Sequence, residues 1–226
     1  MPENPALARL EAVRAKRGYL LPHHGLLAIT APLLLEGYDA CYTALTLTPR
    51  DLSAHDKEFI WLCILIVREE FLASQHLTKF NAAGGTAAEV ETAVRLATLA
   101  RGAIATHFIA EHWQHHLPGY DRERVYGEAL AALMRDLDAR LAHLALCAAH
   151  TSLRGFAELA WHLKQCYALA VPEVEIAEAM SYAMFTGSIP YFIEGCAVWR
   201  DLIRDNQVPA SDTFKAWAAL DQNGPG

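Results

Sequence analysis

The hydrophobic positions of this chain follow helical spacing over most of its length. Apolar residues recur at helical intervals from Ala54 to Ala82 and from Leu141 to Leu169, and in the second segment they surround the helix on nearly every side. A helix that is apolar on all sides needs several neighbours to cover it. The pattern therefore predicts a buried helical bundle and favours assembly into oligomers.

Capping residues and helix breakers divide the rest of the chain into shorter helices. Ser53 is placed to cap the helix from Ala54, and Thr86 with Glu89 forms a capping box that opens the next one. Gly84-Gly85 and Pro118-Gly119 predict helix ends. The polar segment Tyr120–Glu128 is expected to be a connector. Further helices are predicted over Pro5–Arg17, Leu26–Leu45 with a break at Pro32, Thr86–Leu99 and Ile104–His116, and Pro22 is expected to stop regular structure.

Composition supports an all-α protein and narrows its partners. Alanine and leucine dominate the 53% of hydrophobic residues, and β-branched runs are few. The net charge of −7 argues against nucleic acid, which needs a concentrated basic surface. No apolar run is long enough for a membrane span, and Met1–Arg17 lacks a signal-peptide core. We expect a soluble cytoplasmic protein whose five widely spaced cysteines are mostly core residues.

The second half of the chain repeats the first. When His76 is laid on His162, Arg68 falls on Arg154 and Glu89 on Glu175, and the helix breaks on both sides stay in register. Each unit is too small to bury its own apolar faces, so two units packed about a pseudo-twofold axis are expected. The predicted boundaries are an N-terminal helical extension over 1–53, a first repeat over 54–119, a connector over 120–140, a second repeat over 141–204 and a C-terminal tail over 205–226.

These repeats resemble the carboxymuconolactone decarboxylase and alkylhydroperoxidase D superfamily. The resemblance rests on a long helix ending in a histidine (His76, His162), a turn near Gly84 or Ala170, and an acidic helix start at Glu89-Val90-Glu91 or Glu173-Val174-Glu175. It covers about two thirds of the chain. It implies an alkylhydroperoxidase D-like helical bundle, an internal duplication and a homo-oligomer, as trimer or dimer.

The resemblance also implies two possible chemistries. Peroxidase members carry a CxxC pair before the histidine, and this chain has Glu69 and Leu72 at those positions in the first copy and Gly155 and Glu158 in the second. Thiol chemistry needs a sulfur there. Decarboxylase members lack the pair and use acid–base chemistry on small carboxylated lactones, and this chain falls on that side.

A stripe of polar residues near His162 is the main candidate site. His150, Arg154, Glu158 and His162 follow one another at four-residue spacing in an otherwise apolar segment. A guanidinium suits the capture of a carboxylate, and glutamate and histidine can move protons. The plainer interpretation is a salt bridge between Arg154 and Glu158 with His162 buried in an interface.

The remaining candidates are weaker. In the first copy His76 is the candidate catalytic residue, with Glu69 seven residues before it on the same face and Arg68 as a substrate-binding residue. Tyr182 and Tyr191 are expected to line a pocket or to pack in the core. The last set is a histidine-rich segment whose spacing suits either a transition metal or a solvated helix end, and its members are His107, Glu111, His112, His115 and His116.

We therefore expect a cofactor-independent acid–base lyase, a decarboxylase acting on a small carboxylate or lactone. In this scheme Arg154 holds the carboxylate, and Glu158 and His162 move the proton. One alternative is an alkylhydroperoxidase-like oxidoreductase that uses Cys147 or Cys166 near the histidine. The other is a non-enzymatic oligomeric binding or scaffold protein.

Overall fold

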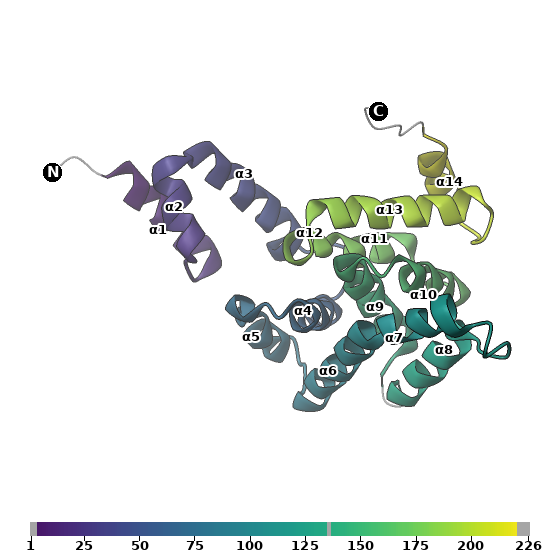
Figure 1. The fold of residues 1–226 in the computed structure, drawn as a ribbon. Helices are drawn as coiled ribbons and strands as arrows, with labels where there is room; N and C mark the ends of the chain where they lie inside the picture. The colour runs from purple at the N-terminus through teal and green to yellow at the C-terminus, as the bar shows by residue number, and fades with distance from the viewer. Residues whose placement is uncertain (1–3, 135–136, 221–226) are drawn as a thin grey trace. The chain divides into compact units, whose positions relative to one another are not determined.

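All the regular secondary structure of the described residues is helical. The computed structural model describes residues 4–134 and 137–220, and within these ranges it contains no strand, as an all-α chain requires. The chain divides into two units, Met1–Pro49 and Arg50–Gly226 (Figure 1). The first boundary therefore lies close to the end of the predicted N-terminal extension.

The N-terminal unit begins its helices at prolines. Asn4 caps the first helix by accepting the N–H of Ala6, and Pro22 and Pro32 each occupy the first turn of the next helix. The expectation that Pro22 stops regular structure is wrong, because a proline at the first helical position loses no hydrogen bond. The helices are α1 (Pro5–Arg17), α2 (Pro22–Thr30), α3 (Pro32–Tyr42) and the π-helical turn η1 (Thr43–Leu47).

The second unit holds the other helices and all the candidate site residues. In chain order they are α4 (Ala54–Arg68), η2 (Phe71–Ala73), α5 (Gln75–Ala82), α6 (Ala87–Gly102), α7 (Ile104–Phe108), η3 (Ile109–Trp113), α8 (Arg122–Leu133), α9 (Ala139–Leu153), α10 (Phe156–Ala168), α11 (Glu173–Ser181), α12 (Ala183–Thr186), α13 (Ile189–Arg204) and α14 (Asp212–Ala219).

The helices α4 and α9 pack against each other in the core of this unit. Nine of the 15 residues of α4 and 12 of the 15 residues of α9 are buried, as expected for helices that several neighbours cover. The helices α5 and α6 cover α4, while α10, α11, α12 and α13 cover α9 (Figure 1). The predicted caps are present, since Ser53 accepts the N–H of Asp56 and Thr86 forms its capping box with Glu89.

Both central helices end at a residue in the left-handed conformation, at Glu69 (φ 56°) and Arg154 (φ 60°). At each end the following N–H turns back to a carbonyl in the last turn, from Glu70 to Leu65 and from Gly155 to His150, both at 2.9 Å. The predicted continuous helices over Ala54–Ala82 and Leu141–Leu169 are therefore wrong. The apolar residues keep their helical spacing through each break, so the spacing alone does not indicate where the helix ends.

Charged side chains tie distant segments of the unit together. Arg140 at the start of α9 pairs with Asp56 of α4 at 2.9 Å and with Glu175 of α11 at 2.5 Å. The buried carboxylate of Glu178 accepts the N–H groups of Asp51 and Leu52 at 2.7 and 2.9 Å. It thereby satisfies backbone groups in the turn before α4.

The segment predicted as a connector contains a helix. Asp121 caps α8 by accepting the N–H of Arg124, and Tyr126 and Leu130 form its buried face. The density of charge over Tyr120–Glu128 hides this short apolar face. The predicted Ile104–His116 helix is shorter than expected, with η3 ending at Trp113. None of the helices in residues 4–134 and 137–220 has the length and apolar character to cross a bilayer.

Gly187 lets α12 and α13 approach α9. A Cβ at this position would lie 2.9 Å from the carbonyl oxygen of Ala183 and 2.9 Å from Cα of Ser152. Gly187→Ala should therefore lower the free energy of unfolding by about 1–3 kcal/mol. Gly102→Ala is the control, because its added Cβ meets nothing within 4 Å. Urea unfolding checks both, and equal effects of the two substitutions would contradict the close approach.

Candidate functional site

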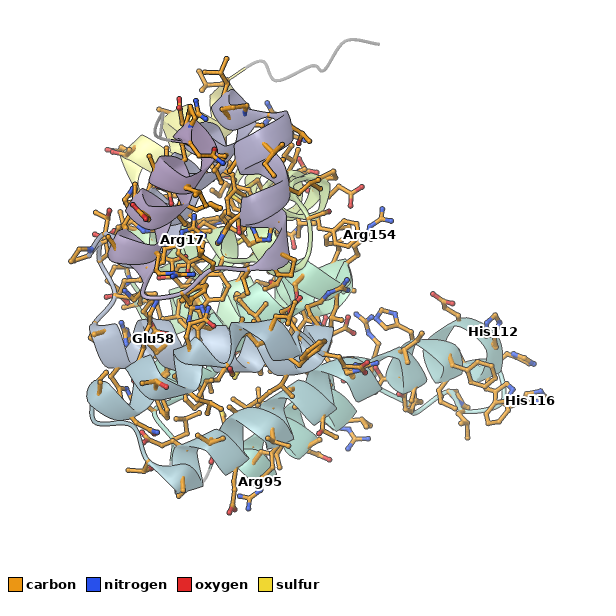
Figure 2. The ribbon with its side chains drawn as sticks, turned by 90° about the vertical axis from the view of Figure 1, so that its left-hand side faces the viewer. Arg17, Glu58, Arg95, His112, His116 and Arg154 are labelled. Atoms are coloured by element: carbon orange, nitrogen blue, oxygen red, sulfur yellow. The ribbon has the colours of Figure 1, made fainter. Side chains whose placement is uncertain are left out.

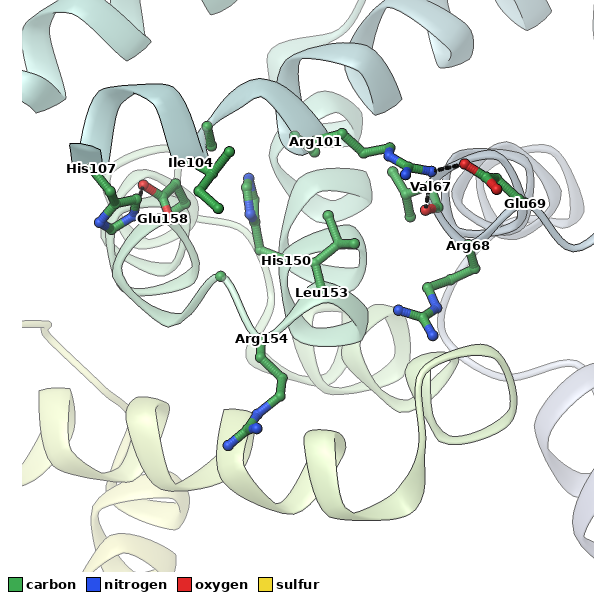
Figure 3. A pocket seen from close by; sticks show the side chains of 13 residues that line it. Val67, Arg68, Glu69, Arg101, Ile104, His107, His150, Leu153, Arg154 and Glu158 are labelled. Atoms are coloured by element: carbon green, nitrogen blue, oxygen red, sulfur yellow. Dashed lines mark hydrogen bonds and ion pairs between the residues drawn. The ribbon is translucent and has the colours of Figure 1, made fainter. Parts of the chain in front are cut away.

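A cavity of about 490 Å³ lies where the ends of α4, α6 and α9 meet the beginnings of α7 and α10 (Figure 3). Its polar lining combines three arginines, two glutamates and two histidines. The lining residues are Val67, Arg68, Glu69, Ala100, Arg101, Ala103, Ile104, His107, His150, Leu153, Arg154, Gly155 and Glu158. The cavity therefore brings together residues from both predicted repeats.

The end of α9 shapes the cavity wall. A Cβ on Gly155 would lie 2.5 Å from Nδ1 of His150, so only glycine lets the backbone turn so close to this ring. After this break the chain continues as the separate helix α10, and Glu158 in the first turn of α10 lines the cavity. The predicted stripe on one helix is wrong, yet the break itself brings His150 and Glu158 to one place.

Arg154 points away from the other members of the predicted stripe. Its guanidinium pairs with Glu194 of α13 at 2.8 Å and lies 5.2 Å from the ring centre of Tyr191. Figure 3 shows the side chain directed toward α13. The predicted salt bridge from Arg154 to Glu158 is therefore wrong, because the left-handed residue separates their helices. Arg154 therefore belongs to the cavity lining, but its guanidinium is directed toward Glu194 and not toward His150 or Glu158.

Two other arginines lie at the α4 end of the cavity. Arg101 of α6 pairs with Glu69 and also reaches the carbonyl of Val67 at 3.3 Å. Arg68 donates to the carbonyl oxygens of Thr186 at 3.1 Å and Ser152 at 3.4 Å. Among the described residues no carboxylate lies within ion-pair distance of Arg68. Its orientation is fixed while its charge stays uncompensated, which suits an incoming anion.

Glu158 is the buried acid of the cavity. Its Oε1 lies 2.7 Å from Nε2 of His107 and 3.4 Å from the guanidinium of Arg122. The carboxylate side chain is 5% exposed, while the His107 side chain is 30% exposed. A buried carboxylate needs such partners. The contact also assigns His107 to this site rather than to the histidine-rich segment.

Behind His150 a chain of hydrogen bonds runs into the core. Nε2 of His150 lies 2.9 Å from the hydroxyl of Tyr126, which lies 2.9 Å from Nε2 of His162. Nδ1 of His162 then lies 2.8 Å from Nδ1 of His143. His162 is fully buried and does not line the cavity. It reaches the cavity only through Tyr126 and His150.

Burial keeps these three histidines neutral. Desolvation lowers the pKa of His150 to about 3 and the pKa of His143 to about 4. The pKa of His162 is also lowered well below its ordinary value, first by desolvation and then by the neighbouring histidines. Desolvation raises the pKa of Tyr126. At neutral pH the hydrogen-bond chain therefore consists of four uncharged side chains, those of the three histidines and Tyr126.

His76 has a different partner from the one predicted. Its Nδ1 lies 2.6 Å from Oε2 of Glu58, and its ring stacks on Trp61 at 4.7 Å. Glu69 pairs with Arg101 on the surface instead, because it occupies the left-handed end of α4. His76 is buried and is not part of the cavity lining. The predicted pairing of Glu69 with His76 is wrong.

The two candidate tyrosines lie outside the cavity lining. Tyr182 is fully buried and donates to Oε1 of Glu178 at 2.5 Å, which agrees with the alternative of core packing. Tyr191 lies near Arg154 on α13. Tyr191 therefore contacts the guanidinium of Arg154, while Tyr182 belongs to the core.

The histidine-rich segment does not converge on one point. Glu111, His112, His115 and His116 are exposed, and Figure 2 shows His112 and His116 at its outer end. Across the described ranges, no group of three or more His, Cys, Asp or Glu side chains is arranged to hold a metal ion. The segment therefore fits the solvated helix end better than the metal site.

Two cysteines lie next to the buried histidines. The sulfur atoms of Cys147 and Cys166 are 4.0 Å apart, and both residues are fully buried. Burial raises the pKa of the Cys147 thiol, first by desolvation. A peroxidase needs an accessible thiolate. This environment therefore weighs against the redox alternative.

Sequence reasoning missed four residues of the site, namely Arg101, Arg122, Tyr126 and His143. Tyr126 and Arg122 belong to the helix that was read as a connector. His143 carries a usable signal, since a histidine inside the apolar α9 needs a buried partner. Arg101 gives no such signal, because its place beside α4 depends on the fold.

A scan against protein-family models and searches of curated proteins and of solved structures find no match to this chain.

The lowered histidine pKa values predict acid sensitivity. A histidine whose folded pKa is depressed takes up a proton on unfolding, so its contribution to stability is complete above the unfolded value of 6.5 and is lost as pH falls toward the folded pKa. For His143, whose folded pKa is about 4, this window runs from about pH 6.5 to 4. Each such histidine adds about 1.4 kcal/mol per pH unit to the slope of unfolding free energy.

Urea unfolding between pH 7.5 and 4.5 measures that slope. His143→Gln should reduce the slope by about 1.4 kcal/mol per pH unit, and His116→Gln, which changes an exposed residue, is the matched control. An unchanged slope in His143→Gln would contradict the assignment of a neutral buried histidine.

Proposed function

We propose that this chain is a cofactor-independent acid–base enzyme that acts on a small carboxylate in the cavity, with decarboxylation as the reaction. The observation that carries the proposal is the uncompensated guanidinium of Arg68 in a cavity that also holds His150 and the His107–Glu158 pair. One end of the cavity can hold an anion, and the other end can move a proton.

Arg68 is the anchor for the substrate carboxylate. Two carbonyl oxygens fix its guanidinium, and no described acid competes for it. Arg101 and Arg154 add positive charge at the same cavity but are already paired with Glu69 and Glu194. A carboxylate therefore gains most at Arg68, where it need not displace an acidic side chain. This assignment replaces Arg154, the residue expected from the sequence.

His107 is the acid in this proposal. The contact between His107 and Glu158 is an ion pair only when the imidazole carries a proton on both ring nitrogens. Both residues line the cavity, so this proton can reach a bound substrate. His150 stays neutral because its pKa is about 3. A neutral imidazole can still donate a hydrogen bond to a developing oxyanion. Glu158 and His150 thus position and stabilise, while His107 transfers the proton.

The reaction breaks the bond between the carboxylate carbon and the adjacent carbon. The bonding electron pair moves into the neighbouring carbonyl or lactone to form an enolate, and carbon dioxide leaves. Protonated His107 then donates its proton to the carbon, and solvent restores the proton to the imidazole. Neither a metal nor an organic cofactor takes part in these steps.

The proposal includes an alkylhydroperoxidase D-like fold with an internal duplication. Its support is the likeness of α4 and α9, which are each 15 residues long and end in the same left-handed turn. In both copies the candidate histidine uses its Nδ1 to contact the central helix before it. His76 of α5 contacts Glu58 of α4, and His162 of α10 contacts His143 of α9. His150 joins the histidine of the second copy to the cavity through Tyr126 of α8, whereas the first copy has Ile64 at the matching position, so the second copy is the active one.

Assembly and location complete the proposal. Exposed apolar side chains on α4's neighbours, such as Phe71 (82%) and Leu77 (41%), support a homo-oligomer, as dimer or trimer. The acidic composition is compatible with a cytoplasmic enzyme that binds a small molecule rather than nucleic acid.

Carbon dioxide release tests the reaction. Purified, metal-stripped protein should release carbon dioxide from some member of a panel of β-keto acids and carboxylated lactones. His107→Gln should lower kcat by about 10²- to 10⁴-fold, because the acid is lost. Release by no member of the panel, or an unaltered kcat in His107→Gln, would overturn the reaction or the role of His107.

Arg68→Gln tests the anchor separately. Losing a charge-assisted contact to the substrate should raise KM by about 10- to 100-fold. Arg95→Gln is the matched control, since Arg95 lies exposed on α6 in an ordinary pair with Glu91. Steady-state kinetics on the same substrate measure both variants. Equal KM values in the two would remove Arg68 from the binding site.

A further inference from the structure

The hydrogen-bond chain behind the cavity links the proton positions of His150, Tyr126, His162 and His143 to one another. Each junction joins two groups that can both donate and accept, namely His150 to Tyr126, Tyr126 to His162, and His162 to His143. Because the chain carries no charge at neutral pH, every junction must hold one shared proton. If the hydroxyl of Tyr126 donates within the chain, the proton positions of all four groups are coupled, because a neutral imidazole carries one ring proton.

Two arrangements satisfy all three junctions with the hydroxyl of Tyr126 donating to one histidine and accepting from the other. In the first, His143 donates from Nδ1 to His162, His162 donates from Nε2 to Tyr126, and Tyr126 donates to Nε2 of His150. His150 then carries its proton on Nδ1, beside the cavity. In the second arrangement every hydrogen bond is reversed, and Nδ1 of His150 is bare.

The two ends of the chain are open. Nδ1 of His150 lies beside Gly155 in the cavity wall, and no described residue hydrogen-bonds to it. At the other end, Nε2 of His143 also has no hydrogen-bond partner among residues 4–134 and 137–220, and the residue is 5% exposed. The inner members, by contrast, are buried between α8, α9 and α10. A proton can thus enter at one end and leave at the other.

We propose that Tyr126, His162 and His143 form a proton relay that lets His150 deliver its Nδ1 proton to a substrate oxyanion in the cavity. When that proton leaves, Tyr126 passes a proton to Nε2 of His150, His162 passes one to Tyr126, and His143 passes one to His162. His143 recovers a proton from solvent at Nε2. This step converts the enolate to an enol and leaves every hydrogen bond of the chain reversed. When His107 protonates the carbon, the enol oxygen returns its proton to Nδ1 of His150, each hydrogen bond reverts, and His143 releases its Nε2 proton to solvent. The hydrogen-bond chain is uncharged before and after both steps.

This relay explains why three histidines that cannot be charged at neutral pH are joined in a row. A lone neutral imidazole would become an anion on giving up its proton, which a buried site cannot stabilise. Passing one proton along the chain avoids both the anion and the imidazolium. The inference rests on the proposed function, because it needs an oxyanion in the cavity. The ordering of protons, however, is independent of any substrate.

Nitrogen-15 NMR of the histidine rings tests the ordering without a substrate. In wild-type protein at pH 7, the relay predicts that His162 and His150 never both carry a proton on Nε2, because both would then donate to Tyr126. It also predicts one Nδ1 proton shared between His143 and His162. Two Nε2 protons facing Tyr126, or none between His143 and His162, would overturn the relay.

Tyr126→Phe interrupts the chain while keeping the ring. It should leave the tautomers of His150 and His162 uncorrelated, and lower kcat about 10-fold or more with little change in KM. Tyr167→Phe is the control, because it removes a hydroxyl that bonds to Glu173 and Trp199, away from the chain. An unaltered kcat in Tyr126→Phe, with turnover present in wild type, would overturn the relay.

The two proposals fail in different ways. Ordered tautomers in a protein that turns over no substrate would leave the hydrogen-bond chain standing and overturn the decarboxylase. Turnover that depends on His107 and Arg68 but not on Tyr126 or His143 would support the enzyme and overturn the relay.

Discussion

The packing of α4 against α9 is the contact on which the rest of the second unit depends. Both helices are apolar on nearly all sides, so each must be covered by several others. Both also end in a left-handed residue, and these two ends lie at the same cavity. The burial that stabilises the unit therefore also fixes the place where polar groups can gather.

The cavity separates two kinds of polar chemistry. Toward solvent lie charged groups, with Arg68, Arg101 and Glu69 at one end and His107 with Glu158 at the other. Toward the core lies the uncharged chain from His150 to His143, held neutral by desolvation. An anion is attracted at the mouth, while the proposed passage of protons along the hydrogen-bond chain toward the cavity creates no buried charge. His150 is the only described residue that belongs to both the cavity lining and the chain.

Much of the fold was predictable because it depends on local chemistry. The all-α class, the caps at Ser53 and Thr86 and the bounds of α1 followed from composition, capping residues and periodicity. The breaks at Glu69 and Arg154 did not, since neither residue favours the left-handed conformation and the apolar spacing runs on through them. The site inherited that error. His150 and Glu158, expected on one helical stripe, both line the cavity although a helix break separates them. Arg154 turns away from them toward Glu194, and Tyr126 was hidden in a segment whose charges masked its buried face.

The most direct test of this account is a crystal structure of the protein with succinate, a small carboxylate that does not decarboxylate readily. The account predicts one carboxylate on the Arg68 guanidinium and the rest of the molecule directed toward His150 and the His107–Glu158 pair. Succinate bound away from Arg68, or absent from this cavity at saturating concentration, would contradict the claim that the cavity is a carboxylate site.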